Sequence, residues 1–127
     1  MNLGIDIHGT LDTIPDVLKP IMRSMVSQGH LVYIITGVPF EYVKDKLDTL
    51  GMIRGYNYTH FFSIEEHLLK KGVRIIGKNK KGRNIYRSID WNITKANYCK
   101  KNNIGLMLDD SKIYGRYFST PYARLQV

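Results

Sequence analysis

The sequence contains a single cysteine, Cys99, so it cannot form an internal disulfide. Its longest uninterrupted apolar run, residues 31–35, is far shorter than the roughly 20 residues that cross a bilayer. A signal peptide is not expected either, because Asp6 interrupts the start and no basic segment precedes an apolar one. These absences predict a cytoplasmic protein without a membrane segment, in a compartment that keeps thiols reduced.

Acidic side chains are scarce in the middle of the chain. The sequence has 19 lysines and arginines against 11 aspartates and glutamates, a formal net charge of +8. Between Lys70 and Lys101 the only acid is Asp90. Such a basic block favours an anionic partner, either a phosphorylated small molecule or a nucleic acid. It is equally compatible with a solvated face that keeps the protein soluble.

Strand-like and helix-like segments alternate along the 127 residues, which suffice for one domain, 1–127. This alternation predicts an α/β fold with βαβ units around a mostly parallel sheet. Strands are expected at residues 2–7, 31–35, 58–62 and 104–108, with a short edge strand near the end at 122–127. Helices are expected at about 16–28, after Pro39, from 63 to 71 and over 93–102.

A few residues mark the expected ends of the helices. Pro20 should lie in the first turn of its helix, because a proline deeper inside would break the hydrogen-bond ladder. Ser63 and Glu66 match a capping box for the third helix. Asn92 or Thr94 can cap the fourth.

The segment 72–90 predicts a small β-hairpin with a basic tip. Two strand-like runs, 73–77 and 83–89, are joined by Lys78-Asn79-Lys80-Lys81-Gly82. The charge of this flap suits a nucleotide or the phosphate end of a nucleic acid. The lysines can equally protect an exposed hairpin edge from aggregation.

Reactive side chains lie where three of the expected central strands end: Asp6, Thr36 and the pair Asp109-Asp110. Because parallel strands end at the same edge of a sheet, these residues should converge there. Carboxylates from two strands can share Mg²⁺, which prefers oxygen ligands. A threonine hydroxyl and nearby backbone amides can hold phosphate oxygens, and a lysine at a helix start can offset their charge.

The ordered set of motifs resembles the haloacid dehalogenase (HAD) superfamily over most of the chain. Asp6-Ile7-His8-Gly9-Thr10 is similar to its nucleophile motif, Asp-x-Asp-Gly-Thr, and residues 31–37 resemble its second motif, a strand ending in threonine. Residues 104–111 resemble its fourth motif, which ends in paired aspartates. Its third motif is a lysine, for which Lys95 is our choice because it opens the preceding helix. The compact spacing is similar to the deoxyribonucleotidase branch, and the rival lysines are Lys78, Lys80, Lys81 and Lys112.

The resemblance implies a Rossmann-like three-layer fold and a role for each matched residue. Asp6 would attack phosphorus and form an aspartyl-phosphate, which water then hydrolyses. Mg²⁺ would bind the Asp6 carboxylate, the His8 backbone carbonyl and Asp109, with Asp110 acting through water. Thr36 and Lys95 would stabilise the transferring group. The residues implied in substrate binding are Gly9, Thr10, Thr36, Gly37 and Lys95.

His8 departs from the family pattern, which has an acid/base aspartate at this position. Imidazole can protonate a leaving group and deprotonate water, since its ordinary pKa is about 6.5. The surrounding carboxylates should favour the imidazolium, which would slow water activation. The alternative is a degenerate site in which His8 only packs or hydrogen-bonds.

The sequence therefore predicts a Mg²⁺-dependent phosphomonoesterase with a hairpin in place of a cap domain. Its substrate would be a nucleotide, another small phosphate ester or a nucleic-acid phosphate end. The alternative is a catalytically weak HAD-like protein that binds nucleic acid or a protein partner through its basic face. No pattern in the sequence indicates an oligomeric state.

Overall fold

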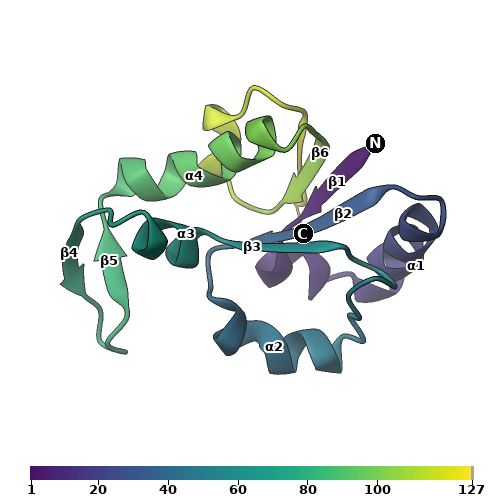
Figure 1. Ribbon diagram of the computed structural model, residues 1–127, viewed down its shortest axis with the longest axis horizontal. Helices are drawn as coiled ribbons and strands as arrows, with labels where there is room; N and C mark the ends of the chain where they lie inside the picture. Colours follow the sequence, from purple (N-terminus) through teal and green to yellow (C-terminus); the bar gives the residue numbers. More distant parts are fainter. Residues whose placement is uncertain (127) are drawn as a thin grey trace.

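A five-stranded parallel sheet forms the centre of the protein in a computed structural model, which describes residues 1–126. The strands lie in the order β3-β2-β1-β6-β7 (Figure 1). Their bounds are β1 (Asn2–Ile5), β2 (Leu31–Thr36), β3 (His60–Ser63), β6 (Ile104–Asp109) and β7 (Tyr122–Arg124). The predicted α/β fold is confirmed, and every strand pair in this sheet is parallel.

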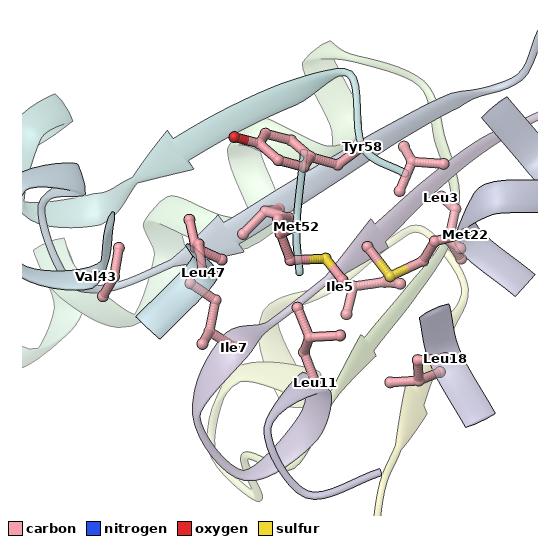
Figure 2. Close-up of a cluster of buried hydrophobic side chains, with 12 residues drawn as sticks. Leu3, Ile5, Ile7, Leu11, Leu18, Met22, Val43, Leu47, Met52 and Tyr58 are labelled. Atoms are coloured by element: carbon pink, nitrogen blue, oxygen red, sulfur yellow. The ribbon is translucent and has the colours of Figure 1, made fainter. Parts of the chain in front are cut away.

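Helices cover both faces of the sheet, so the fold has the three layers of a Rossmann-like domain. The helices are α1 (Pro15–Ser27), α2 (Phe40–Thr49), α3 (Ile64–Lys70) and α4 (Ser88–Lys101). Val32 and Ile34 of β2 pack on the side of α1 and α2, where Figure 2 shows Ile5 and Met22 meeting. Side chains alternate along a strand, so Tyr33 packs on the opposite side with α3 and α4. In Figure 1, α4 lies above the sheet and α1 and α2 lie below it.

Helix α1 contains a proline in its interior, where we had expected none. The helix begins at Pro15, which suits the first helical position, so Pro20 lies inside it rather than in its first turn. Pro20 cannot donate to the carbonyl of Asp16 four residues earlier. Both residues are exposed, so water can satisfy that carbonyl. The prediction about Pro20 was wrong because it ignored the side of the helix on which the proline lies.

Helix α4 begins five residues before its expected start, at Ser88. Arg87 donates two hydrogen bonds to the Asp90 carboxylate, at 2.9 and 3.1 Å, and this pair stabilises the first turn. The Thr94 hydroxyl donates back to the Asp90 carbonyl inside the helix. The predicted caps at Asn92 and Thr94 were therefore wrong. At α3 the predicted cap is confirmed, since Ser63 Oγ accepts from Glu66 N at 3.2 Å.

The predicted hairpin is confirmed as a two-stranded antiparallel sheet, separate from the central one. It consists of β4 (Ile75–Lys78) and β5 (Asn84–Tyr86), at the left end of Figure 1. The four residues of β4 are all exposed. Tyr86 is buried in the domain, and Arg83 forms an ion pair with Glu65 of α3. Within residues 1–126, no helix has the length and apolar character needed to cross a bilayer.

Candidate active site

Two aspartates lie side by side where the central strands end. Asp6 directly follows β1 and Asp109 is the last residue of β6. The parallel register pairs Ile5 with Leu108, and Asp6 N extends this ladder by donating to Leu108 O at 3.0 Å. Both aspartates are almost fully buried, with 5% and 1% of their surfaces exposed. The predicted convergence of these two residues is therefore confirmed.

Lys95 links the two buried carboxylates. Its Nζ donates to Asp6 Oδ1 at 3.0 Å and to Asp109 Oδ2 at 2.8 Å, and only 2% of the residue is exposed. Lys95 lies in the second turn of α4, because that helix begins at Ser88, so our expectation that it opens the helix was wrong. Helix α4 nevertheless places the Lys95 ammonium beside the aspartates at the ends of β1 and β6. The rival lysines are exposed, three of them in the hairpin segment and Lys112 in the loop after β6.

The buried charges shift one another's pKa. Burial raises the pKa of Asp6 from 3.8 to about 7, with a contribution from Asp109 and in spite of Lys95. Burial would lower the pKa of Lys95, yet the two carboxylates raise it above its ordinary value. The raised pKa of Asp6 therefore comes mainly from burial, with the neighbouring carboxylates adding to it.

The loop after β1 makes room for a third carboxylate, that of Asp110, which directly follows β6. Gly9 has a φ of +79°, and a Cβ there would lie 2.1 Å from Asp110 Oδ2. Gly9 is therefore required both for the turn and for the close approach of Asp110. Its N–H donates to Asp12 Oδ1 at 2.8 Å, and Asp12 Oδ2 accepts from Lys46 of α2 at 2.6 Å. These bonds fasten the loop to the body of the domain.

His8 precedes Gly9 in this loop and is exposed to solvent. Partial burial lowers its pKa below 6.5, and Lys46 lowers it further, while Asp12 and Asp110 oppose the shift. The expectation that carboxylates would favour the imidazolium was therefore wrong. It counted the aspartates of the site but left out the partial burial of the imidazole and the charge of Lys46, which no sequence pattern places near His8.

Thr36 and Gly37 lie at the end of β2, as predicted. Thr36 is buried and its Oγ1 accepts from Val38 N at 3.4 Å, so it also shapes the turn. A Cβ on Gly37 would lie 2.8 Å from the Trp91 ring, which explains the glycine. Thr10 is also buried, and its hydroxyl has no hydrogen-bond partner within residues 1–126. The substrate-binding roles of these residues stay predictions.

Four residues near the site were missed by the sequence analysis. Asp12 and Lys46 fix the loop that carries His8, as described above. Tyr114 places its ring 4.8 Å from Lys95 Nζ, and Trp91 Nε1 donates to the Tyr114 hydroxyl at 2.8 Å. Asp12 lies two residues after the motif Asp6-Ile7-His8-Gly9-Thr10, but the other three come from distant segments and carry no local signal.

The three carboxylates form a donor set that fits a hard cation. One oxygen each from Asp6, Asp109 and Asp110 lie within 4.8 Å of one another. Oxygen ligands of this kind suit Mg²⁺, and three carboxylates beside one ammonium leave negative charge that a divalent ion would offset. A search of family models, curated proteins and solved structures found no match to this chain.

Proposed function

We propose that the protein is a Mg²⁺-dependent phosphomonoesterase of the HAD type, with Asp6 as its nucleophile. The observation that carries the proposal is the contact of one buried lysine with two carboxylates at the strand ends, Lys95 with Asp6 and Asp109. An isolated Asp-Asp or Thr-Gly pair is common in proteins. Burying Lys95 between Asp6 and Asp109, with Asp110 nearby, costs desolvation free energy. A role in stabilising the fold rarely accounts for such a cluster.

The metal set would be Asp6, Asp109, Asp110 and the backbone carbonyl of His8. Bound there, Mg²⁺ would reduce the repulsion between a phosphate ester and the carboxylates that it has to approach. Lys95 supplies further positive charge from the buried side. Lys95 donates its hydrogen bond to Oδ1 of Asp6, so Oδ2 would be the oxygen that attacks phosphorus.

The chain's own residues account for two steps. In the first, Asp6 forms a bond to phosphorus while the ester P–O bond breaks, and the leaving alkoxide takes a proton. In the second, water attacks the aspartyl-phosphate and gives up a proton, releasing phosphate and free Asp6. His8 is the acid/base in both steps, and its lowered pKa favours the second, since neutral imidazole accepts a proton. Thr36 and the amides around Gly9 and Gly37 hold the phosphoryl oxygens.

The substrate would be a nucleotide, another small phosphate ester or the phosphate end of a nucleic acid. In place of a cap domain the chain has the short hairpin within 72–90, whose tip carries lysines and no acid. A site beside such a flap admits substrates of varied size and favours anionic ones.

The test is a panel of nucleoside monophosphates, sugar phosphates and 5′-phosphorylated oligonucleotides, each with Mg²⁺ or with EDTA. We expect phosphate release by the parent with Mg²⁺, and a loss of at least about a thousandfold in Asp6→Asn. Asp16→Asn, an exposed aspartate in α1, is the matched control and should turn over like the parent. An inactive parent across the panel would contradict the proposal.

A second candidate function is nucleic-acid binding through the basic hairpin, with weak or no catalysis. It is favoured by Lys78, Lys80 and Lys81, which are exposed together at the tip. A protein partner with an acidic surface would suit the same face. Binding to phosphate backbones would weaken steeply with salt and would persist in Asp6→Asn, whereas phosphatase activity would not.

A further inference from the structure

A groove of about 510 Å³ lies between α3, α4 and the edge strand β3. The α4 wall consists of residues that recur on one side of that helix, namely Thr94, Asn97, Tyr98, Lys101 and Asn102. The groove includes none of the carboxylates of the candidate active site. Its volume is within the range of about 300–1,000 Å³ that small-molecule sites occupy.

Aromatic rings form the apolar part of this groove. The rings of Phe62 and Tyr98 are stacked, with their centroids 3.8 Å apart. The His67 ring lies against Phe62 at 5.3 Å. Phe62 is buried in this stack, so the rings of the group that remain partly exposed in the groove are those of Tyr98 and His67. A planar ring can stack on an aromatic side chain of this kind.

Lysines supply the charged part. Lys70, Lys71 and Lys101 line the groove, and none of them forms an ion pair in the part of the chain that the structure describes. The one acid in the lining is Glu66, whose carboxylate accepts from Phe40 N at 2.6 Å. Burial lowers the pKa of His67, and the same three lysines lower it further. The groove therefore has a positive potential with little to offset it.

We propose that this groove binds a nucleotide unit, with the base against the partly exposed Tyr98 ring and the phosphate among the three lysines. Base stacking and lysine–phosphate attraction are the two elements by which proteins hold nucleotides without base-specific readout. Asn97 and Asn102 can add hydrogen bonds to the base or sugar. The unit is either a free nucleotide or one residue of a single-stranded nucleic acid. This site is independent of catalysis at Asp6.

The first experiment locates the ligand. The parent protein, in EDTA so that turnover is prevented, is titrated with adenosine 5′-monophosphate and followed by the shifts of backbone amide resonances. The amides around Phe62, His67 and Tyr98 should move together and saturate. Shifts confined to the loop of Gly9 and the amide of Gly37, or to the hairpin, both with this ligand and with the oligonucleotide described below, would overturn the proposal.

The second experiment compares two triple variants with the same change in charge. Replacing Lys70, Lys71 and Lys101 by alanine should weaken binding of adenosine 5′-monophosphate by at least about tenfold, since charged hydrogen bonds to phosphate are lost. Replacing Lys78, Lys80 and Lys81 of the hairpin should weaken it by less than about threefold. Equal effects would mean that net charge alone attracts the ligand, and would overturn the site.

A substitution that fills the groove provides an independent check. Asn97 is exposed on α4, so Asn97→Trp should fold normally and occupy the space of the base, with a loss of binding of about tenfold or more. Unchanged affinity in this variant would contradict the proposal. So would adenosine or inorganic phosphate binding as tightly as the nucleotide, because recognition needs both parts.

The last comparison separates the two sources of the ligand. An oligothymidylate of about ten nucleotides, within the range bound by single-strand sites, is titrated under the same conditions. Groove shifts with both ligands show that the isolated nucleotide suffices. Groove shifts with the oligonucleotide alone identify a single strand as the source. No groove shifts with either ligand would refute the site.

Discussion

The two basic features of this protein, the buried Lys95 and the exposed hairpin, use the same side chain in opposite ways. Lys95 is 2% exposed and lies within 3.0 Å of two carboxylates. The lysines of the hairpin tip are exposed, and they form no ion pair among residues 1–126. The first arrangement fixes one charge at one position, whereas the second spreads charge over a surface.

The difference lies in how each feature is supported. The active-site charges are held by the strand register, by α4 and by the Asp12–Lys46 contact with the loop. The hairpin is joined to the domain mainly by Tyr86 and by Arg83, which pairs with Glu65 and lies over the Tyr42 ring. We therefore expect substitutions at the site to have large, position-specific effects and substitutions at the hairpin to have small, additive ones.

The largest contrast should come from replacing each kind of lysine by methionine. In metal-free buffer, Lys95→Met leaves Asp6 and Asp109 buried without their counter-charge, which should cost about 3–5 kcal/mol in the free energy of unfolding. Lys80→Met at the hairpin tip should change it by less than about 0.5 kcal/mol. Urea unfolding measures both. A loss below about 1 kcal/mol for Lys95→Met would mean that the buried cluster is not tightly coupled.

Two glycines with similar backbone angles give a second contrast. Gly9 and Gly82 have φ of +79° and +75°, so alanine at either should cost about 1 kcal/mol of stability. At Gly82 the new Cβ meets nothing within 4 Å, whereas at Gly9 it must displace the Asp110 carboxylate. Gly9→Ala should therefore weaken Mg²⁺ binding about 10- to 100-fold, measured by calorimetry, and Gly82→Ala should not. Equal Mg²⁺ affinities in the two variants would show that Asp110 does not contribute to Mg²⁺ binding.

The pH dependence of stability gives a third and smaller contrast. The pKa of Asp6 is raised to about 7 in the folded protein, so the folded state binds a proton that the unfolded chain has lost. Without metal, this contribution to stability declines as the pH rises through the interval between 3.8 and about 7. Asp6→Asn removes it, so the variant should gain stability relative to the parent between about pH 5 and about pH 8.

Asp12→Asn is the control for this experiment. The Lys46 contact lowers the pKa of Asp12 even though burial opposes the shift, so its contribution is lost only as the pH falls below the ordinary range of an aspartate. The difference between Asp12→Asn and the parent should change less between about pH 5 and about pH 8 than the difference for Asp6→Asn, because in that interval Asp12 acts only through its charge on His8. A difference for Asp6→Asn that stays constant over the same interval would show that burial of Asp6 does not perturb its ionisation.

The smallest effect is expected at the hairpin. Alanine at Lys78, Lys80 and Lys81 together should change kcat on a small phosphate ester by less than about twofold, because no atom of the tip belongs to the carboxylate cluster. Steady-state kinetics at two salt concentrations measures the effect. A loss comparable to that of Asp6→Asn would show that the hairpin closes over the substrate and belongs to the catalytic site.

Much of this architecture could be predicted because its signals are local. The apolar runs around Ile5, Ile34 and Met107 predict buried parallel strands, and parallel strands bring Asp6, Thr36 and Asp109 to one edge. The basic hairpin follows equally from two strand-like runs and a lysine-rich tip that contains Asn79 and Gly82.

The remaining features depend on contacts between distant segments. The pKa of His8 is set partly by Lys46, which lies 34 residues from the Asp12 that it contacts. The groove beside Tyr98 needs α3, α4 and β3 to be assembled. No periodicity in the sequence encodes such contacts, because each is decided by packing in three dimensions.

The most direct test of the central claim is to trap the phosphoryl group on the protein. The parent is mixed with its best substrate and Mg²⁺, quenched in acid within one turnover, digested and analysed by mass spectrometry. We predict a phosphoryl group on Asp6 that is absent in EDTA and absent in Asp6→Asn. Turnover with the phosphoryl group on His8 instead, or turnover by Asp6→Asn at the parent rate, would contradict the account.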